Sequence, residues 1–383
     1  MGPMRPMRLM GPMGPMGPMG LMGPMGLIGL MGLMCGSCSE EKIEPTMRTV
    51  EVTSYVSWFE ENIAVTRAWA APTGYTLYDT GDNSIGICFT QNGKEPMIGQ
   101  FFASSDKWRT NIEDIVGEDY YLYGYAPHIA GMSCEISSSA TPNDWTSFNT
   151  GAVMKLKNVP TVMGQDLCAV IGAKEGPNKD TDNSLRRGDF KYRASASETG
   201  NFVFLLFDHL YAALNINIRV HGTYDALRTI KLKKITLHSM SNDIPTKENT
   251  DITITLTAND GSSSPITSIT YEPKGGDSGD QKVFTSSVGT ELTTSYQSFV
   301  GHFMPTGVTK FLMTSVYDIY DKKGNKVREG CKATNAFVLS ELFDRYEETE
   351  KIGTRYNINL TIQPTYLYVL SEPDLNNPIL TVN

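Results

Sequence analysis

The stretch ALNINIRV (213–220) decides the fold class, because apolar side chains occupy every second position along it. Leucine, isoleucine or valine stands at 214, 216, 218 and 220, and asparagine or arginine stands between them. Successive side chains of a β-strand point to opposite faces, so this alternation predicts a strand with one buried face and one polar face. An α-helix would need a period of 3.6 residues, which this stretch lacks.

The same period of two returns along the chain from residue 47 onward. The other alternating stretches are DITITLT (251–257), YNINLTI (356–362), TVEVTSYV (49–56), YYLYGYAP (120–127), GAVMKLKNVP (151–160) and TIKLKKITL (229–237). Turn signals such as Asn92-Gly93 and Asp260-Gly261 separate them. The chain is therefore predicted to be all-β, with antiparallel sheets packed face to face. One segment, 335–349, has near-helical spacing and predicts either a short helix or a loop that covers a sheet edge.

The first 37 residues differ from the rest, because every third residue from Gly11 to Gly32 is glycine. A collagen-like helix needs this spacing, but the run is short. Arg5 and Arg8 supply a positive start, and no charge follows until after Ser39. This arrangement favours a secretory signal peptide over residues 1–37. The formal net charge of the chain is −9, which argues against a nucleic-acid partner.

Cys38 is a better candidate for lipidation than Cys35, because the small residues Gly36 and Ser37 precede it. Bacterial lipoprotein signals end in such a cysteine, although an aliphatic residue usually stands where Cys35 stands here. The acidic residues that follow Cys38 are typical of lipoproteins exported to the outer face of the outer membrane, or of a plain charged linker. Because two acyl chains anchor a protein stably, the membrane contact is predicted to be the lipid anchor alone.

Residues that could carry chemistry are scattered. The five histidines show no metal-ligand spacing, and Asp208-His209 is predicted to be structural. The tyrosines of 120–125 could stack sugars, but such alternation more often serves cross-strand packing. Arg187-Gly188-Asp189 spells an integrin-binding tripeptide and is also ordinary turn composition. The acidic loops 178–183 and 372–377 lack the EF-hand pattern. No enzymatic activity, metal or cofactor is predicted.

Four cysteines lie in the body of the chain at wide spacings: Cys88, Cys134, Cys168 and Cys331. An exported location permits disulfides, and four cysteines allow three pairings among which the sequence does not choose. Buried free thiols are the other interpretation.

Several stretches, in this order and spacing, resemble the fimbrillin family, the type V pilins. They are YYLYGYAP (120–127), GAVMKLKNVP (151–160), CAVIGAKEG (168–176), NFVFLLFDHLYAALNINIRV (201–220), TIKLKKITLHS (229–239) and LYVLSEPDLNNP (367–378). The resemblance implies two transthyretin-like antiparallel β-sandwich domains in tandem and no enzymatic activity. It also implies a surface lipoprotein that a trypsin-like protease cuts after an arginine. The cut releases the first strand, and a C-terminal strand of another subunit fills the groove.

Carried onto this chain, the resemblance places the plug strand in TMRTVEVTSYVSWF (46–59), with Val50, Val52 and Val56 on its pocket-filling face. Arg67 is the preferred cut site, with a new N-terminus at Ala68, and Arg48 is the alternative. The donor strand would be 366–383. Its candidate pocket-filling residues are Tyr366, Leu367, Tyr368, Val369 and Leu370. Two prolines, which cannot donate hydrogen bonds to a neighbouring strand, interrupt the candidate donor. A tip, accessory or base subunit is therefore an alternative to a stalk subunit.

The predicted domains are a signal peptide (1–37), a lipidated propeptide (38–67), an N-terminal sandwich (68–190) and a C-terminal sandwich (191–383). The predicted function is a structural subunit of cell-surface fimbriae that serves adhesion or biofilm formation. Its partners would be other fimbrial subunits, the trypsin-like surface protease, and a host or bacterial surface ligand. The alternative is a monomeric surface-anchored lipoprotein that binds glycans or host ligands.

Overall fold

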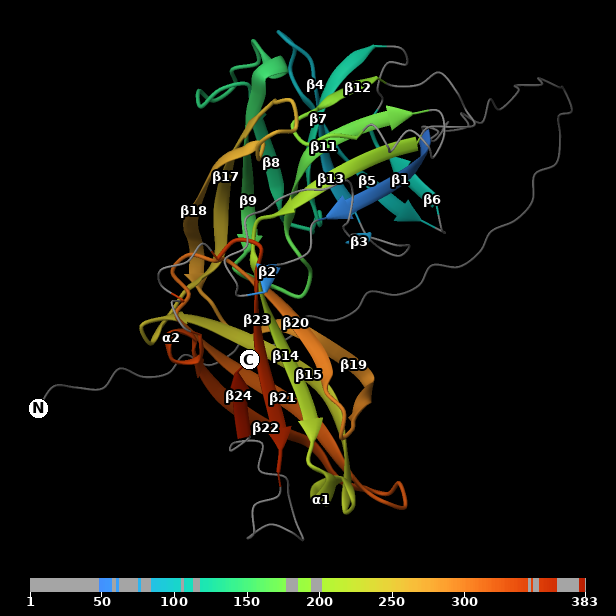
Figure 1. Cartoon of the computed structure of the whole chain (residues 1–383), viewed down its shortest axis with the longest axis vertical. Helices are drawn as coiled ribbons and strands as arrows, with labels where there is room; N and C mark the ends of the chain where they lie inside the picture. Colours follow the sequence, from blue (N-terminus) through green and yellow to red (C-terminus); the bar gives the residue numbers. More distant parts are fainter. Residues whose placement is uncertain are drawn as a thin grey trace, which may run out of the picture. The chain divides into compact units, whose positions relative to one another are not determined.

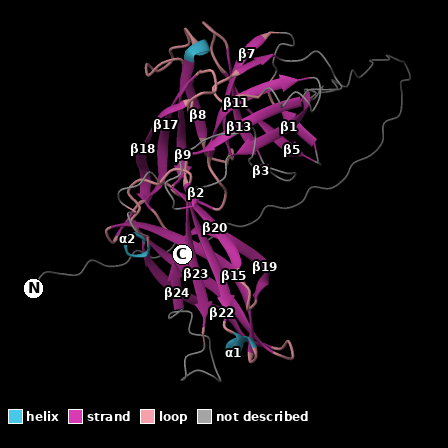
Figure 2. Ribbon diagram, viewed as in Figure 1, coloured by secondary structure: helices cyan, strands magenta, loops and turns pink. Residues whose placement is uncertain are grey.

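The computed structural model is built almost entirely of β-strands (Figures 1 and 2). It describes residues 48–56, 60–61, 75–76, 84–104, 107–112, 118–176, 185–193, 202–343, 346, 351–363 and 379–382. Cys38, Arg67 and Tyr366–Leu370 lie outside these residues. The prediction of an all-β chain is confirmed. In the described ranges, no helix is long and apolar enough to cross a membrane.

The first sheet closes into a ring. Its strands are β1 (Arg48–Val56), β4 (Ser84–Thr90), β5 (Met97–Ser104), β6 (Lys107–Thr110), β7 (Asp119–Ala126), β11 (Cys168–Gly176) and β13 (Phe202–His209), with β3 (Tyr75–Thr76) and β12 (Lys191–Arg193) attached. They pair in the order β11-β13-β1-β6-β5-β4-β7, and β11 also pairs with β7. Alternate apolar side chains of these strands form one hydrophobic cluster, with Ile87, Phe101, Leu122 and Leu205 at its centre and all 0% exposed.

A second sheet packs on the other face of this ring. Its strands are β8 (Ser133–Ser137), β9 (Gly151–Pro160), β17 (Lys247–Thr257) and β18 (Ile266–Asp277). A short 3-10 helix, η1 (Phe148–Thr150), precedes β9. The shared core joins Tyr123 and Tyr125 of the ring to Met154, Leu156 and Ile254 of the second sheet. Burial of these large side chains is the main force that holds the two layers together.

Two further sheets enclose a separate core. One contains β2 (Glu60–Glu61), β10 (Val162–Met163), β14 (Ala212–Val220), β20 (Gln297–Phe303), β23 (Thr354–Ile362) and β24 (Ile379–Val382). The other contains β15 (Arg228–Ser241), β16 (Ile244–Pro245), β19 (Gln281–Leu292), β21 (Lys310–Asp321) and β22 (Lys326–Val338). The short helices α1 (Gly222–Asp225) and α2 (Leu339–Leu342) flank this core. Residues 335–338, where helical spacing was noted, therefore continue a strand before one helical turn.

The alternating stretches ALNINIRV and YNINLTI are direct neighbours in parallel orientation. Their apolar residues lie in the core. On the opposite face, Asn215 Nδ2 donates to Asn357 Oδ1 at 2.8 Å, and Asn217 Nδ2 donates to Asn359 Oδ1 at 2.9 Å. These amide pairs are matched across the two strands in the register that buries the apolar face of each strand. The strands β1–β13 and β2–β23 also pair in parallel. The ring and the sheet of β14 and β23 are therefore mixed, whereas every described pair in the other two sheets is antiparallel.

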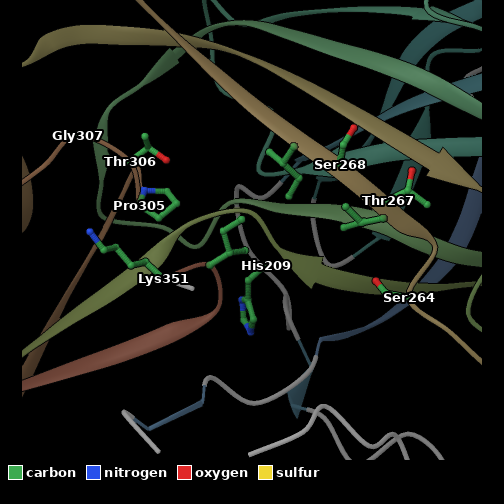
Figure 3. Close-up of a pocket in the computed structure, with 11 residues that line it drawn as sticks. His209, Ser264, Thr267, Ser268, Pro305, Thr306, Gly307 and Lys351 are labelled. Carbon is green, nitrogen blue, oxygen red and sulfur yellow. The ribbon is translucent and has the colours of Figure 1, made fainter. Parts of the chain in front are cut away.

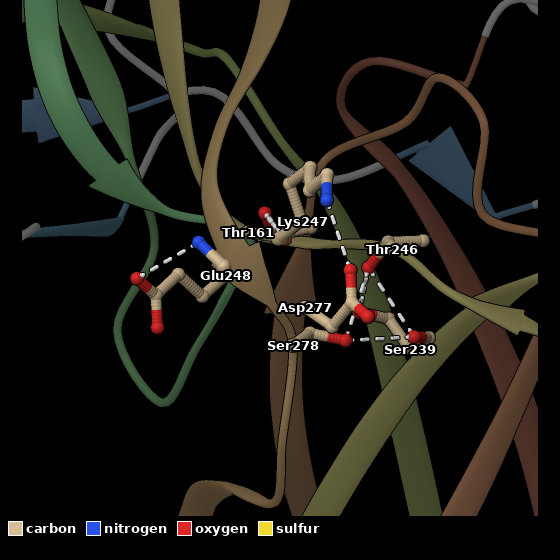
Figure 4. Close-up of polar contacts among 8 residues, drawn as sticks. Thr161, Ser239, Thr246, Lys247, Glu248, Asp277 and Ser278 are labelled. Carbon is tan, nitrogen blue, oxygen red and sulfur yellow. Dashed lines mark hydrogen bonds and ion pairs between the residues drawn. The ribbon is translucent and has the colours of Figure 1, made fainter.

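A buried group of hydroxyl side chains lies where the chain passes from β16 into β17 and from β18 into β19 (Figure 4). Thr246 Oγ1 and Ser239 Oγ are 2.6 Å apart, and Ser278 Oγ donates to the carbonyl of Ser239 at 2.9 Å. Thr161, between β9 and β10, donates to the carbonyl of Lys247 at 2.5 Å. Three passages of the chain between the sheets are thereby joined by hydrogen bonds.

Strand pairs cross the predicted boundary between residues 190 and 191. β12 and β13, which follow it, pair with β7 and β11, and the hairpin of β17 and β18 pairs with β9. The division into domains at that point stays a prediction.

Candidate functional site

β1 occupies a slot in the ring between two strands from distant parts of the sequence (Figure 1). Glu51–Val56 pair in parallel with Phe202–Phe207 of β13, and Arg48–Val50 pair antiparallel with Trp108–Thr110 of β6. Because β1 supplies the hydrogen-bond partners on both sides, its removal would leave two unpaired strand edges facing each other. Such edges recruit another strand readily.

The side chain of Val52 is partly buried and packs against the hydrophobic cluster of the ring. Ser54, two residues on and therefore on the same face, is 1% exposed. Val50 and Val56 share this face and stand opposite Trp108 and Phe207, but their side chains lie outside the described residues. Sequence reasoning overlooked Ser54, because a polar residue within an apolar alternation gives no signal of burial.

Two short strands pair with the edge of β23 that faces away from β14. On the side away from β14, Thr354 and Arg355 pair in parallel with β2, and Ile358–Thr361 pair antiparallel with β24. The last residues of the chain thus form a strand against a strand of the same chain. The predicted donor residues Tyr366–Leu370 lie outside the described residues.

A cluster of buried polar side chains lies around His209 at the end of β13. The ring atom Nδ1 lies 2.8 Å from Asp166 Oδ2 and 3.8 Å from Cys168 Sγ. Burial alone raises the pKa of Asp166, but the neighbouring His209 and His302 outweigh it and bring the pKa below its usual value. The pKa of His302 is lowered to about 4, chiefly by burial. The three side chains at His209 offer oxygen, sulfur and nitrogen within 4.8 Å of one another.

This arrangement suits a structural role better than catalysis. The carboxylate and the thiol both meet the same nitrogen of His209, so the imidazole cannot relay a proton between them. Burial also raises the pKa of Cys168, which is 0% exposed, so the thiol stays protonated and cannot be reached by a substrate.

A cavity of about 600 Å³ lies beside this polar group (Figure 3). Its lining residues include His209, Ser264, Thr267, Ser268, Thr306 and Lys351. The imidazole of His209 points away from Thr306 and Lys351 (Figure 3). Such a lining can hold a small polar ligand through hydrogen bonds.

The tyrosines of the 120–125 stretch are core residues for the most part. Tyr120, Tyr123 and Tyr125 are 2% exposed or less, and Tyr123 donates to the carbonyl of Phe148 at 2.8 Å. They cannot stack sugars from solvent.

The Arg-Gly-Asp tripeptide is not displayed as a binding loop either. Arg187 is 8% exposed, and its Nη2 lies 3.5 Å from Asp208 Oδ2.

No protein-family model matches the sequence, and no curated protein matches it significantly. Solved structures of proteins from Bacteroides and Porphyromonas species match most of this chain at low sequence identity. A candidate cell adhesion protein from Bacteroides uniformis shares 13% identity and a TM-score of 0.32, covering 83% of this chain and 94% of its own. The fimbrial anchor protein Mfa2 from Porphyromonas gingivalis shares 10% identity and a TM-score of 0.24, covering 86% and 95%. A fimbrial protein from Bacteroides ovatus has 10% sequence identity and a TM-score of 0.28. The match covers 82% of this chain and 48% of the other.

Proposed function

We propose that this protein is a structural subunit of cell-surface fimbriae, assembled by strand exchange after proteolysis, and that it serves adhesion or biofilm formation. The observation that carries the proposal is the position of β1. It fills a slot between β13 and β6 while belonging to the part of the chain that precedes Arg67. A single cut therefore separates this strand covalently from the ring that holds it.

The position of the cut decides what is released. Cleavage after Arg67 would detach both β1 and β2, whereas cleavage after Arg48 would leave β1 attached, since Arg48 is its first residue. Loss of β1 would expose the edges of β6 and β13 and the cluster that contacts Val52. An incoming strand restores both the backbone hydrogen bonds and the apolar contacts. Because donor and acceptor are different surfaces, the contact repeats head to tail and gives a filament.

The same proposal includes the membrane anchor and the partners of the protein. The precursor is tethered to the outer membrane by lipid on Cys38, a trypsin-like surface protease makes the cut, and the partners are other fimbrial subunits. A host or bacterial surface ligand is the adhesion target.

The C-terminal strand is the candidate donor. In this structure β24 pairs with β23 of the same chain, so donation requires it to leave that edge. A subunit that keeps β24 in place would instead suit the tip or the base of a fimbria, or an accessory role.

The first experiment compares Arg67→Ala with its matched control Arg48→Ala. Each purified precursor is treated with trypsin, and polymers are followed by size-exclusion chromatography and electron microscopy. We expect Arg67→Ala to remain monomeric and Arg48→Ala to polymerise like the wild type. Polymers of Arg67→Ala at the wild-type rate would overturn the assignment. Intact mass and N-terminal sequencing of protein from native cells give a second test, with Ala68 expected for a polymerised subunit and acylated Cys38 for an anchor.

The donor is tested by deleting residues 378–383, which contain β24. Loss of polymer formation, with trypsin cleavage unchanged, would identify β24 as the donor. Unchanged assembly would point to Tyr366–Leu370 or to a role outside the stalk.

The cavity beside His209 supports a second candidate, a monomeric surface lipoprotein that binds glycans. An oligosaccharide array should then show binding that Thr267→Ala and Thr306→Ala together abolish. Equal binding by the double variant, or none by the wild type, would exclude the cavity as a glycan site.

A further inference from the structure

Two of the four cysteines in the body of the chain lie side by side. Cys88 in β4 is 0% exposed, and Cys134 in β8 is 8% exposed. They are 46 residues apart in sequence, and their Sγ atoms are 3.6 Å apart. In the reduced chain, one thiol can donate a weak hydrogen bond to the other.

The location of each thiol separates this pair from the other two cysteines. Cys88 and Cys134 both belong to the core between the ring and the second sheet. Cys168 belongs to the cluster on the other face of the ring, where its Sγ lies 3.8 Å from His209 Nδ1. Cys331, on β22, packs against the core of the remaining two sheets. Of the six pairs that four cysteines allow, Cys88–Cys134 alone joins thiols of the same core.

We propose that Cys88 and Cys134 form a disulfide that ties β4 of the ring to β8 of the second sheet. The two thiols lose two protons and two electrons as their S–S bond forms. The electrons pass to an oxidant of the disulfide class, such as oxidised glutathione or an oxidised thiol–disulfide oxidoreductase, whose own S–S bond is reduced to two thiols. The exchange proceeds through a mixed disulfide between the oxidant and one of the two cysteines.

Burial dictates when this oxidation takes place. In the folded chain neither sulfur is open to an oxidant, and the contact with Cys88 and burial raise the pKa of Cys134 well above its usual value. A protonated, covered thiol reacts slowly. The bond therefore forms during folding, before the second sheet covers the ring.

The Cys88–Cys134 disulfide would not prevent β1 from leaving the ring, a consequence that rests on the proposed function. Two strands, β6 and β5, separate β1 from β4 in the ring. The disulfide would hold the second sheet against the ring while β1 is exchanged.

The test uses the full chain with Cys35→Ser and Cys38→Ser, so that four thiols remain. The protein is reduced, unfolded, and refolded with or without oxidised glutathione. Free thiols are then alkylated, and non-reduced peptides are mapped by mass spectrometry. We expect a linked pair of peptides containing Cys88 and Cys134, with Cys168 and Cys331 alkylated. We also expect a thermal midpoint roughly 5–10 °C higher than that of the reduced chain.

Matched variants keep the result clear. Cys331→Ser should keep the linked peptides, and Cys88→Ala should abolish them. If Cys88→Ala does not fold, the peptide map of the four-thiol chain decides alone. Alkylation of all four thiols after refolding with oxidant, or a linked peptide containing Cys168 or Cys331, would overturn the proposal. Because Arg67→Ala should form the same link, failure of strand exchange would not affect this result.

Discussion

His302 lies in β20 with 7% of its surface exposed. Three groups near it, Asp166, His209 and Arg355, influence its titration, but burial dominates and lowers its pKa to about 4 from the ordinary 6.5. At neutral pH the imidazole is therefore uncharged in the folded chain. Acid must charge it in the core or unfold the protein.

Stability should fall as the pH drops from about 6.5 to about 4. In this window the unfolded chain binds a proton at residue 302 and the folded chain does not, so the free energy of unfolding decreases with falling pH. The full difference in pKa corresponds to about 3 kcal/mol. We expect His302→Gln to flatten the slope of urea-unfolding free energy against pH between these values.

The core variant Phe303→Leu is the control for this measurement. It should lose stability at every pH while keeping the wild-type slope, because it removes packing and no titrating group. An unchanged slope in His302→Gln would show that other groups govern acid unfolding.

The arrangement of single residues was predictable only where the period of two applied. Val52 was expected on the pocket-filling face of the plug strand, which stays a prediction; in the structure it is partly buried against the ring cluster. The burial of Arg187 beside Asp208 had no sequence signal, because the two residues lie 21 positions apart. Their contact requires the strand that carries Asp208 to meet the loop after β11.

At the scale of elements, β1 is set apart by how it is held. Its neighbours β6 and β13 come from distant parts of the sequence, and it runs parallel to β13. A period of two predicts that 49–56 is a strand, but it gives neither partner nor direction. Parallel pairing could not be anticipated, because it depends on which slot in the ring is open.

Weakening the apolar face of β1 should loosen the strand without unfolding the chain. Val52→Asp places a charge against the hydrophobic cluster of the ring, at a cost of about 2 kcal/mol. Hydrogen exchange measured by mass spectrometry should then quicken at the backbone of Phe202–Phe207, which pairs with β1.

Thr53→Asp is the matched control, since residue 53 points to the opposite face of the same strand. Equal exchange rates in the two aspartate variants would mean that the contact made by Val52 does not hold β1 in its slot.

At the scale of the whole molecule, the cluster of hydroxyl side chains around Thr246 connects the sheets where the chain passes between them (Figure 4). Thr246 is 9% exposed, and Ser239 and Ser278 are 0% and 4% exposed. Thr246→Val keeps the volume but leaves these two serines without a hydroxyl partner, which should cost about 1–3 kcal/mol of unfolding free energy.

The measurement is thermal or urea unfolding compared with that of Thr257→Val. Thr257 is an exposed residue at the end of β17, the strand that follows Thr246. We expect the exposed variant to stay within about 0.5 kcal/mol of the wild type. Equal stability of the two valine variants would show that the hydroxyl group does not stabilise these passages.

The sequence by itself determined that this is an all-β chain and which apolar residues of the alternating stretches face a core, because a strand's two faces impose a period of two on any half-buried sheet. The tertiary structure alone decided the ring closed by β1, the parallel pairing of the strands around residues 216 and 358, and the meeting of Cys88 with Cys134. These depend on contacts between segments far apart in sequence. No local pattern encodes which strand becomes whose neighbour, since hydrophobic burial rewards any partner that covers the same face.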